Sequence, residues 1–293
     1  MTDDAASNRL GQYLRARRGL VSPERAGIPP GGDRRVPGLR REEVAALAGI
    51  SADYYLRLER GRDTNPSAQV LDALARVLAL DEVETAYLHH LAESPRRPAR
   101  RRRTAERVPA RLRHLLDSLG VPAFVEGKTF DVLASNDLAT ALSPRLRPGQ
   151  NRLRSLLLDP EEQAFQKDWA GSTAAFIGAL RSTIGDDVDD PRFVELVGEL
   201  SISSGRFREL WARQDVRALE GGTTVVNHPV VGELTLHRDK LPVGDVLLVV
   251  YYAETGSESA GKLALLGSLA STSDDAGAST AARTETGMPA DSR

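Results

Sequence analysis

Seven residues in and just before the segment REEVAALAGISADYYLRLERG have the types and spacing needed to read DNA. An arginine can donate two hydrogen bonds to guanine, an aspartate can accept one from the cytosine amino group, and an alanine methyl can contact the thymine methyl. Arginines at the start of a helix lie where the helix N-terminus meets phosphate. The candidate DNA-binding residues are Arg40, Arg41, Ser51, Ala52, Asp53, Tyr54 and Arg57.

Two short helices joined by a tight turn are needed to present these side chains. Apolar residues recur at helical spacing through the segment. Those expected to face the core are Val44, Leu47 and Ala48 in the first helix and Ile50, Tyr55 and Leu58 in the second. Gly49 supplies the turn, the Ser51 hydroxyl can accept from a free backbone N–H, and Gly61 can end the second helix in a left-handed conformation. The N-terminal part of the second helix would then enter the major groove.

Further helices are expected on both sides of this pair. A helix over residues 9–18 turns Leu10 and Leu14 inward, and a Pro- and Gly-containing loop follows it. In that loop, Arg34 and Arg35 either contact the DNA backbone or remain solvated. The residues expected to cap the two downstream helices are Ser67, Asp81 and Glu84.

The stretches LAGIS, YLRLERG and NPSAQVLDALARVLAL resemble the helix-turn-helix domain of XRE or phage Cro/C1 repressor-like proteins. The resemblance runs over five expected helices and implies binding to double-stranded DNA. It also implies that an arginine of the first helix pairs with the glutamate of the ERG signature, here Arg15 with Glu59. The alternative is a plain amphipathic helical hairpin, which the matched caps and the downstream helices disfavour.

Charge is unevenly distributed along the 293 residues. The net charge is −2, but residues 1–113 hold 22 Arg and no Lys against 15 acidic residues, a balance of +7 that leaves −9 for the remainder. A basic N-terminal part suits a polyanion through counterion release.

The absence of cysteine excludes thiol catalysis, disulfides and Cys-ligated metals. Without a secretory signal or an apolar stretch of bilayer length, a cytoplasmic protein with no membrane contact is expected.

Catalytic and metal sites are not expected. None of the five histidines, at positions 89, 90, 114, 228 and 237, pairs with a carboxylate at the spacing of a helical metal site. The sequence contains no GxSxG, no GxxxxGK[ST] and no GxGxxG after a strand. The acidic run at 186–190 lacks the alternating ligands of a calcium loop, which favours a solvated turn. The sequence therefore predicts no enzyme, no cofactor and no metal site.

Two domains, a linker and a tail are predicted. Residues 1–93 form the helix-turn-helix domain. Residues 94–111 contain a run of six arginines within eight residues, and are either a solvated spacer or an auxiliary phosphate clamp. Residues 112–269 form the second domain. Residues 270–293 are polar and without periodicity, so they are expected to be disordered.

The second domain alternates blocks of strands and helices. Two short strands, 123–125 and 130–134, are joined by a tight turn and followed by a helical block with helix starts at Pro160 and Pro191. Three strands follow, in TTVVN, GELTLHR and VLLVVYY, the last buried on both faces. This order predicts a PAS-like fold, an antiparallel sheet with inserted helices around a small-molecule pocket. The two-domain chain as a whole then belongs to the α+β class.

The stretches VPAFV, FDVLASN, RSLLLDPEE, FQKDW, ELSISSGRFRELWARQDV and HPVVGELTL, with GLRREEVAALAGIS upstream, resemble the MmyB-like transcriptional regulators. The resemblance covers about residues 10–266 and implies a PAS-like domain that accepts a lipid-like, long-chain molecule. Ser135 stands where the family commonly has Trp before Asn, which alters an expected pocket wall. The candidate ligand-binding residues are Phe124, Asn136, Trp169, Phe176, Trp211, His228 and Tyr251. The aromatic ones also suit the core, and for His228 bonding to backbone groups at a strand start is favoured.

These observations predict a one-component transcriptional regulator that binds double-stranded DNA as a homodimer. A small apolar effector in the second domain would bias its DNA-bound conformation. The alternative is a ligand-independent regulator whose PAS-like domain serves dimerisation or binds a partner protein. An enzyme with a DNA-binding appendage lacks a catalytic constellation to support it.

Overall fold

The computed structural model describes residues 8–29, 34, 36–63, 65–93, 107–185, 188–218 and 221–269. Contacts divide the chain into two compact units. The bundle unit comprises Met1–Arg103 and Thr173–Leu219, and the sheet unit comprises Thr104–Ser172 and Glu220–Arg293. Arg35, the arginine run of the expected linker, the start of the acidic run and the expected disordered tail lie outside the described residues.

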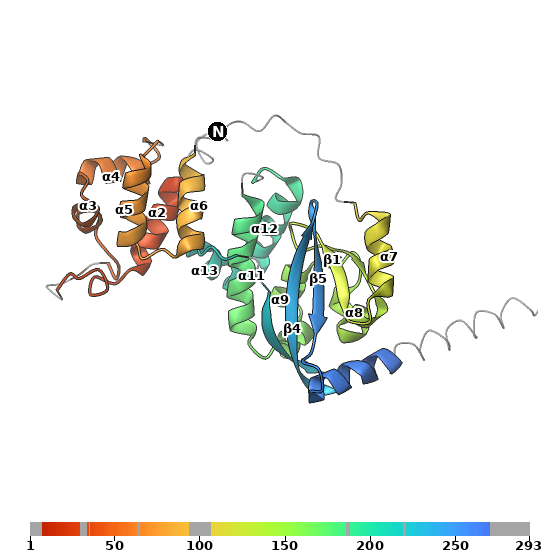
Figure 1. Cartoon of the computed structure of the whole chain (residues 1–293). Helices are drawn as coiled ribbons and strands as arrows, with labels where there is room; N and C mark the ends of the chain where they lie inside the picture. Colours follow the sequence, from red (N-terminus) through yellow and green to blue (C-terminus); the bar gives the residue numbers. More distant parts are fainter. Residues whose placement is uncertain are drawn as a thin grey trace, which may run out of the picture. The chain divides into compact units, whose positions relative to one another are not determined.

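The bundle unit contains the five helices that the N-terminal sequence predicts (Figure 1). They are α2 (Arg9–Leu20), α3 (Arg41–Ala48), α4 (Ala52–Glu59), α5 (Ala68–Val77) and α6 (Glu82–Ala92). The same unit holds most of α11 (Trp169–Ile184), together with α12 (Pro191–Ser203) and α13 (Gly205–Ala212). Val216, which follows α13, is buried in the same hydrophobic cluster as the N-terminal helices.

Local capping explains where these helices begin and end. Ser51 Oγ accepts a hydrogen bond from the Tyr54 backbone N–H at 3.1 Å. Gly49 and Gly61 adopt left-handed conformations, with φ of 68° and 67°. All of these sequence expectations are confirmed. The remaining expected caps also form, at Ser67, Asp81 and Glu84.

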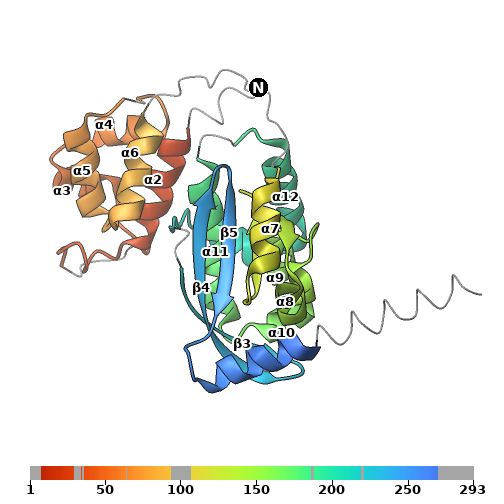
Figure 2. The ribbon, with the colours of Figure 1, turned by 45° about the vertical axis from the view of Figure 1, so that its right-hand side comes forward.

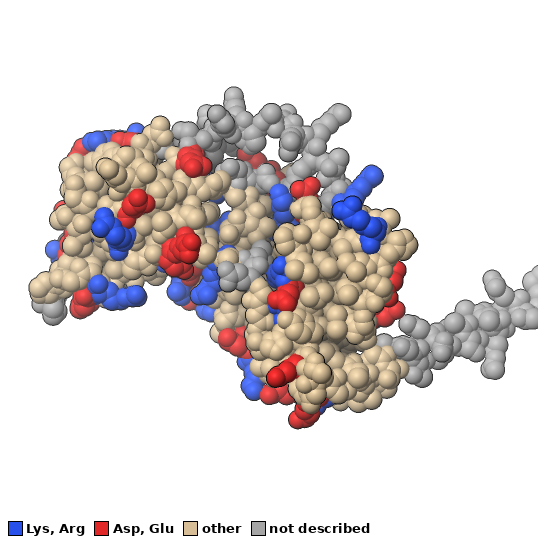
Figure 3. All heavy atoms as spheres, viewed as in Figure 1, with Lys and Arg blue, Asp and Glu red and all other residues tan. Residues whose placement is uncertain are grey.

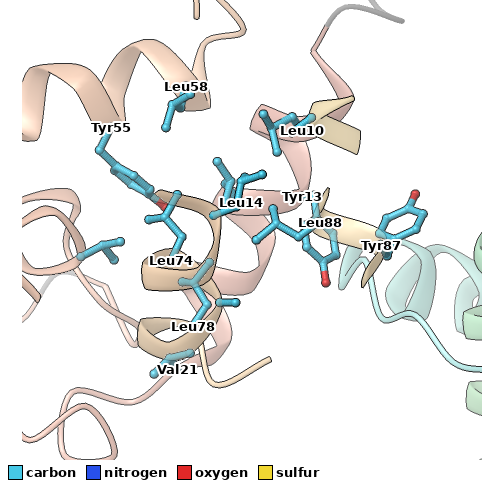
Figure 4. Packing of buried hydrophobic residues seen from close by; sticks show 14 of the residues in the cluster. Leu10, Tyr13, Leu14, Val21, Tyr55, Leu58, Leu74, Leu78, Tyr87 and Leu88 are labelled. Atoms are coloured by element: carbon cyan, nitrogen blue, oxygen red, sulfur yellow. The ribbon is translucent and has the colours of Figure 1, made fainter. Parts of the chain in front are cut away.

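The core of the N-terminal helices is formed by apolar residues from all five of them (Figure 4). Tyr55 and Leu58 are completely buried, as predicted, but Leu47 is 46% exposed, so its expected place in the core is wrong. α3 turns Val44 and Ala45 inward. At 3.6 residues per turn, position 47 lies about 200° around the helix axis from Ala45 and therefore faces solvent.

The sheet unit is built on a five-stranded antiparallel sheet in the order β2-β1-β5-β4-β3. The strands are β1 (Ala123–Glu126), β2 (Val132–Ser135), β3 (Gly222–His228), β4 (Gly232–Val243) and β5 (Val246–Tyr252). The predicted succession of two strands, a helical block and three strands is confirmed. Phe130, expected in the second strand, instead has a φ of 64°, and its N–H donates to Gly127 O at 3.0 Å in the preceding turn.

Short helices complete the sheet unit. They are α7 (Ala110–Ser118), α8 (Asp137–Leu142), α9 (Arg152–Leu158), α10 (Pro160–Phe165), the 3-10 turn η1 (Pro144–Leu146) and a final helix over residues 258–269. The predicted helix starts at Pro160 and Pro191 are confirmed. In the described part of the chain, none of the helices combines the length and apolar character of a membrane span.

The two faces of the sheet carry separate hydrophobic clusters, because successive strand residues point to opposite sides. Phe124 and Tyr251 pack in one cluster, to which Leu266 of the final helix contributes. Val125 packs on the opposite face with Leu116 of α7. Figure 2 shows α7 lying alongside the strands. The sheet is therefore buried on both sides, which accounts for the long apolar run of β5.

Candidate functional site

The first turn of α4 presents the predicted base-reading residues to solvent. Ser51, Ala52 and Asp53 are exposed, and Tyr54 and Arg57 are partly exposed. These residues follow the tight α3–α4 turn, and among them only Tyr54 packs in part against the core. This is the arrangement in which a helix-turn-helix inserts its second helix into the major groove.

Arg57 is held by two neighbours on α4. Its Nη1 forms an ion pair with Asp53 Oδ2 one turn earlier. Its guanidinium carbon also lies 5.5 Å from the centre of the Tyr54 ring. The side chains of Arg57 and Asp53 are 44% and 75% exposed, so their ion pair is weak in water. Both side chains can exchange it for contacts to a base edge.

Glu59, the last residue of α4, is buried and joins three helices. Its Oε1 accepts from Arg18 Nε of α2 at 2.7 Å, and its Oε2 accepts from Arg41 Nε of α3 at 2.6 Å. Burial opposes ionisation of this carboxyl, but the two hydrogen bonds outweigh burial and hold the pKa of Glu59 below its ordinary value. Arg41, a predicted DNA contact, therefore has an internal partner, while 39% of its side chain remains exposed.

The expected pairing of Arg15 with Glu59 is wrong. Arg15 is exposed, and the acceptors of Glu59 are occupied by Arg18 and Arg41. Arg18 follows the buried Leu14 by four residues, and residues four apart share a helix face. It is therefore Arg18 whose side chain reaches the end of α4.

Glu43 fixes the start of α3. Its Oε2 accepts from the Arg40 backbone N–H at 2.7 Å and from Arg34 Nη2 at 2.6 Å. Burial raises the pKa of the Glu43 carboxyl, but these bonds more than compensate, and the pKa lies below its ordinary value. Arg34, a candidate for backbone phosphate, thus has an acidic partner. Arg40 itself is exposed beside the helix start.

Much of the positive charge of the N-terminal helices is paired internally. On the face seen in Figure 3, basic and acidic side chains are interspersed over the helical bundle. An arginine that already holds a carboxylate attracts phosphate less strongly than one that does not. The arginines of this region that pair with a buried or half-buried carboxylate are Arg17, Arg18, Arg34 and Arg41.

Two of the predicted ligand-binding residues, Phe124 and Tyr251, lie together on one face of the sheet. Their rings are stacked with centres 6.2 Å apart. Arg152 of α9 adjoins both, with its guanidinium carbon 4.9 Å from the Phe124 ring centre and its Nη2 donating to Tyr251 Oη at 3.0 Å. Both aromatic side chains are buried. They form a closed aromatic and cationic contact in the sheet unit.

A buried charge cluster continues from this contact. Glu126 accepts from Lys240 Nζ at 2.6 Å and from Arg152 Nη1 at 2.9 Å. The side chains of Glu126 and Lys240 are almost completely inaccessible. Burial disfavours the charged ammonium and, although Glu126 opposes this effect, lowers the pKa of Lys240 to about 8. The cluster was not predicted, since its members come from β1, α9 and β4 and share no local pattern.

Asn136 and His228 bond mainly to backbone groups. Asn136 Oδ1 accepts from the N–H groups of Ala123 and Ala139, while its Nδ2 donates to Val121 O at 2.8 Å. His228 Nε2 lies 3.1 Å from the carbonyl oxygen of Ala141, and its Nδ1 accepts from two backbone N–H groups. Both side chains therefore fix local backbone. Asn136 additionally lines a surface groove.

The remaining three predicted ligand-binding residues are tryptophans and a phenylalanine of the helical block. Trp169 Nε1 donates to Leu156 O at 2.7 Å within the sheet unit. Phe176 and Trp211 belong to the bundle unit. There the Trp211 ring stacks 3.8 Å from the guanidinium carbon of Arg181. The seven predicted residues are thus distributed over both units. Within the described residues, no group of three or more metal-ligating side chains is present.

Comparisons with known proteins match both parts of the chain. A family model described as the MmyB-like transcription regulator ligand binding domain matches residues 108–266, and one described as a helix-turn-helix domain matches residues 9–88. The chain is also similar to a curated relative, the uncharacterized HTH-type transcriptional regulator y4dJ of Sinorhizobium fredii. The two are 47% identical over 51 residues, which is 17% of this chain and 65% of the relative. The match therefore spans less than two thirds of the relative's length.

Proposed function

This chain belongs to the family of MmyB-like transcription regulators, and on that premise we propose that it binds operator DNA through α3 and α4 under the control of an effector. The observation that carries the proposal is the exposed first turn of α4, placed directly after a tight turn from α3. Its neighbours Tyr55 and Leu58 are completely buried, so the helix is fixed while its outer face is free.

We assign roles to the predicted residues by what each side chain can bond. Arg57 can donate two hydrogen bonds to guanine, Asp53 can accept from cytosine, and Ala52 can contact a thymine methyl. Tyr54 borders this surface. Ser51 and Arg40, at the starts of α4 and α3, would contact phosphate and set the register. Arg41 would contact phosphate only with the exposed part of its side chain.

A homodimer would place two copies of α4 in successive major grooves. Helix-turn-helix dimers bind half-sites about one helical turn apart, so a pseudo-palindromic operator is expected. The acidic balance of the remainder of the chain, −9 against +7 for residues 1–113, supports placing the DNA contact in the N-terminal helices.

Effector binding is proposed for the MmyB-like domain. A ligand changes DNA affinity only if it binds one conformation more tightly than another. The family model is that of a ligand-binding domain, and the elements it covers include the sheet and its helices. A small, mainly apolar molecule is the expected effector class.

Operator selection followed by fluorescence anisotropy tests the DNA-binding part. Random-sequence selection with the full chain should return a pseudo-palindrome. Arg57→Ala should weaken binding to it by about 5- to 150-fold, since one bidentate base contact is worth about 1–3 kcal/mol. Arg76→Ala is the matched control, an exposed arginine of α5 whose Nε donates to the Asp72 carbonyl oxygen of the same helix. Equal affinity of Arg57→Ala, Tyr54→Ala and wild type would refute the assignment of α4.

Native mass spectrometry of the purified full chain tests the effector part. A stoichiometric small molecule retained on the protein supports effector control. If ligand-free protein binds its operator fully and no extract of small molecules alters that binding, the domain serves dimerisation or partner binding instead.

A further inference from the structure

A surface groove in the sheet unit is a candidate effector site. It encloses about 840 Å³ and lies between the α7–β1 connection, the β2–α8 junction, the end of β5 and the final helix at 258–269. Figures 1 and 2 both show that final helix beside α8. Pockets of about 300–1,000 Å³ are typical for small molecules. All the residues that line the groove belong to one unit.

Hydrogen bonds of Asn136 hold the inner wall of the groove together. Asn136 Nδ2 donates to the carbonyl oxygens of Leu116, Leu119 and Val121, and so ties the end of α7 to β1. On the opposite side, the final helix approaches α8 so closely that a Cβ on Gly267 would lie 3.0 Å from a side-chain carbon of Leu138. A preformed site loses less entropy when it binds a ligand.

Apolar side chains line part of the groove, alongside polar groups. The apolar ones are Leu119, Val121, Pro122, Leu138, Ala253, Ala260, Leu263 and Ala264. Tyr252 also lines it, and its hydroxyl donates to Asp239 at 2.8 Å, which anchors the ring. An aromatic ring on such a wall can contact an alkyl chain, and its face can contact a cation.

Among the described residues that line the groove, two are charged, Asp117 and Asp137. Both are exposed, and neither forms an ion pair or a side-chain hydrogen bond within the described part of the chain. Asp117 is in the last turn of α7, where the helix dipole disfavours a negative charge. A negative charge at this position therefore does not stabilise α7. Two exposed carboxylates beside apolar lining residues such as Leu263 complement a ligand with an apolar body and one positive end.

We propose that this groove is the effector site of the ligand-binding domain and that the effector is an amphipathic amine, with its alkyl part along the final helix and its ammonium group at Asp117 and Asp137. The proposal rests on the proposed function in one respect, that this domain binds an effector. It specifies the mainly apolar effector further, as one that also carries a cationic end. It also places the ligand away from the closed Phe124 and Tyr251 contact.

Titration calorimetry of the full chain with three probes of equal length tests the charge preference. The probes are n-octylammonium chloride, sodium octanoate and 1-octanol. We expect n-octylammonium to bind most tightly, octanol more weakly and octanoate least tightly. The affinity for n-octylammonium should fall as the salt concentration rises. Octanoate binding as tightly as n-octylammonium, or no binding of any probe, would overturn the proposal.

Two sets of variants locate the bound amine. Asp117→Asn combined with Asp137→Asn should weaken n-octylammonium binding by about tenfold, because two exposed carboxylates each contribute up to about 1 kcal/mol. Asp245→Asn, an exposed acid in the β4–β5 turn, is the matched control. Ala264→Trp should fill the groove and abolish binding of the alkyl chain. Unchanged affinity in either test variant would overturn the assignment.

Measuring operator binding with the same protein preparations distinguishes failure of the groove assignment from failure of the proposed DNA-binding function. A protein that binds its operator but not n-octylammonium overturns the groove assignment alone. If the wild-type protein does not bind operator DNA, the proposed function itself is contradicted.

Discussion

Arg41 Nε lies 2.6 Å from Glu59 Oε2, which joins the first residue of α3 to the last residue of α4. Arg18 of α2 holds the other oxygen of the same carboxylate. Because Glu59 is buried, its charge is compensated only while these three helices keep their mutual arrangement. The angle at which α4 would enter DNA is thus fixed by an ion cluster as well as by the hydrophobic core.

Glu59→Gln should destabilise the protein by about 3 kcal/mol, since removing one member of a buried ion cluster leaves the others uncompensated. Urea unfolding monitored by circular dichroism measures the change. Glu42→Gln, an exposed acid of α3, is the control and should change stability little. Equal midpoints for the two variants would show that the Glu59 cluster contributes nothing.

The lowered pKa of Glu59 leads us to expect that the folding stability depends on pH in the acidic range. Its folded pKa is below the ordinary value of 4.5. A carboxyl whose pKa is depressed on folding contributes stability that is fully present above the ordinary pKa and is lost as the pH falls through the folded pKa. Wild-type protein should therefore lose stability below about pH 4.5 more steeply than Glu59→Gln. Parallel curves for the two proteins would contradict this assignment.

Local signals in the sequence predicted most of the N-terminal helices, because caps and turns depend on residues a few positions apart. Ser51, Gly49 and Gly61 act as expected. The partner of Glu59 was predicted wrongly as Arg15. A long side chain on any turn of a helix can satisfy a distant carboxylate, and only the helix phase, set by packing, selects Arg18.

Asp53→Asn should change how the protein discriminates between DNA sequences. The substitution removes the ion pair of Asp53 with Arg57 and one negative charge from the proposed DNA-binding surface. Affinity for non-specific DNA should rise by about two- to fivefold, and the preference for the selected operator should fall. Anisotropy titrations with operator and scrambled duplexes at several salt concentrations measure both. If Asp245→Asn has the same effect, the change reflects net charge alone.

The lowered pKa of Lys240 leads us to expect a second pH dependence of the folding stability, at alkaline pH. Its pKa falls from 10.5 to about 8 on folding. Between these values the unfolded chain binds more protons than the folded one, so stability contributed by this group rises with pH, by at most about 1.4 kcal/mol per pH unit. Lys240→Met should flatten this rise in urea midpoints between pH 8 and 10. Lys167→Met, which removes an exposed lysine paired with Glu233, should leave it unchanged.

The cluster around Lys240 shows what the sequence could not predict in the second domain. The succession of strands along the chain and the bounds of β5 follow from local periodicity. Glu126 and Lys240 are 114 positions apart, and charged residues are ordinarily expected at the surface. Their contact depends on the pairing of β1 with β5 and of β5 with β4, which no local pattern records. The groove beside the final helix was missed for the same reason.

An ion pair and a buried valine attach residues of the ligand-binding match to the N-terminal helices. Arg17 of α2 places Nη1 2.7 Å from Asp215 and Nη2 2.7 Å from Glu84 of α6. The next residue, Val216, is buried in the core of the same helices. Residues 215 and 216 lie within the 108–266 match. They therefore form a physical connection inside the bundle unit through which the ligand-binding segment can influence α2.

Arg17→Ala and Asp215→Ala should each lower stability, and together by less than the sum, with a coupling energy of about 1 kcal/mol for this half-buried pair. A double-mutant cycle in urea measures it. Arg213→Ala provides the control, because Arg213 Nε also binds Asp215, at 3.0 Å, but from within the same loop. Its removal should leave the Arg17–Asp215 coupling in place. A coupling energy near zero, or one abolished by Arg213→Ala, would mean that the Arg17–Asp215 pair does not attach this segment to α2.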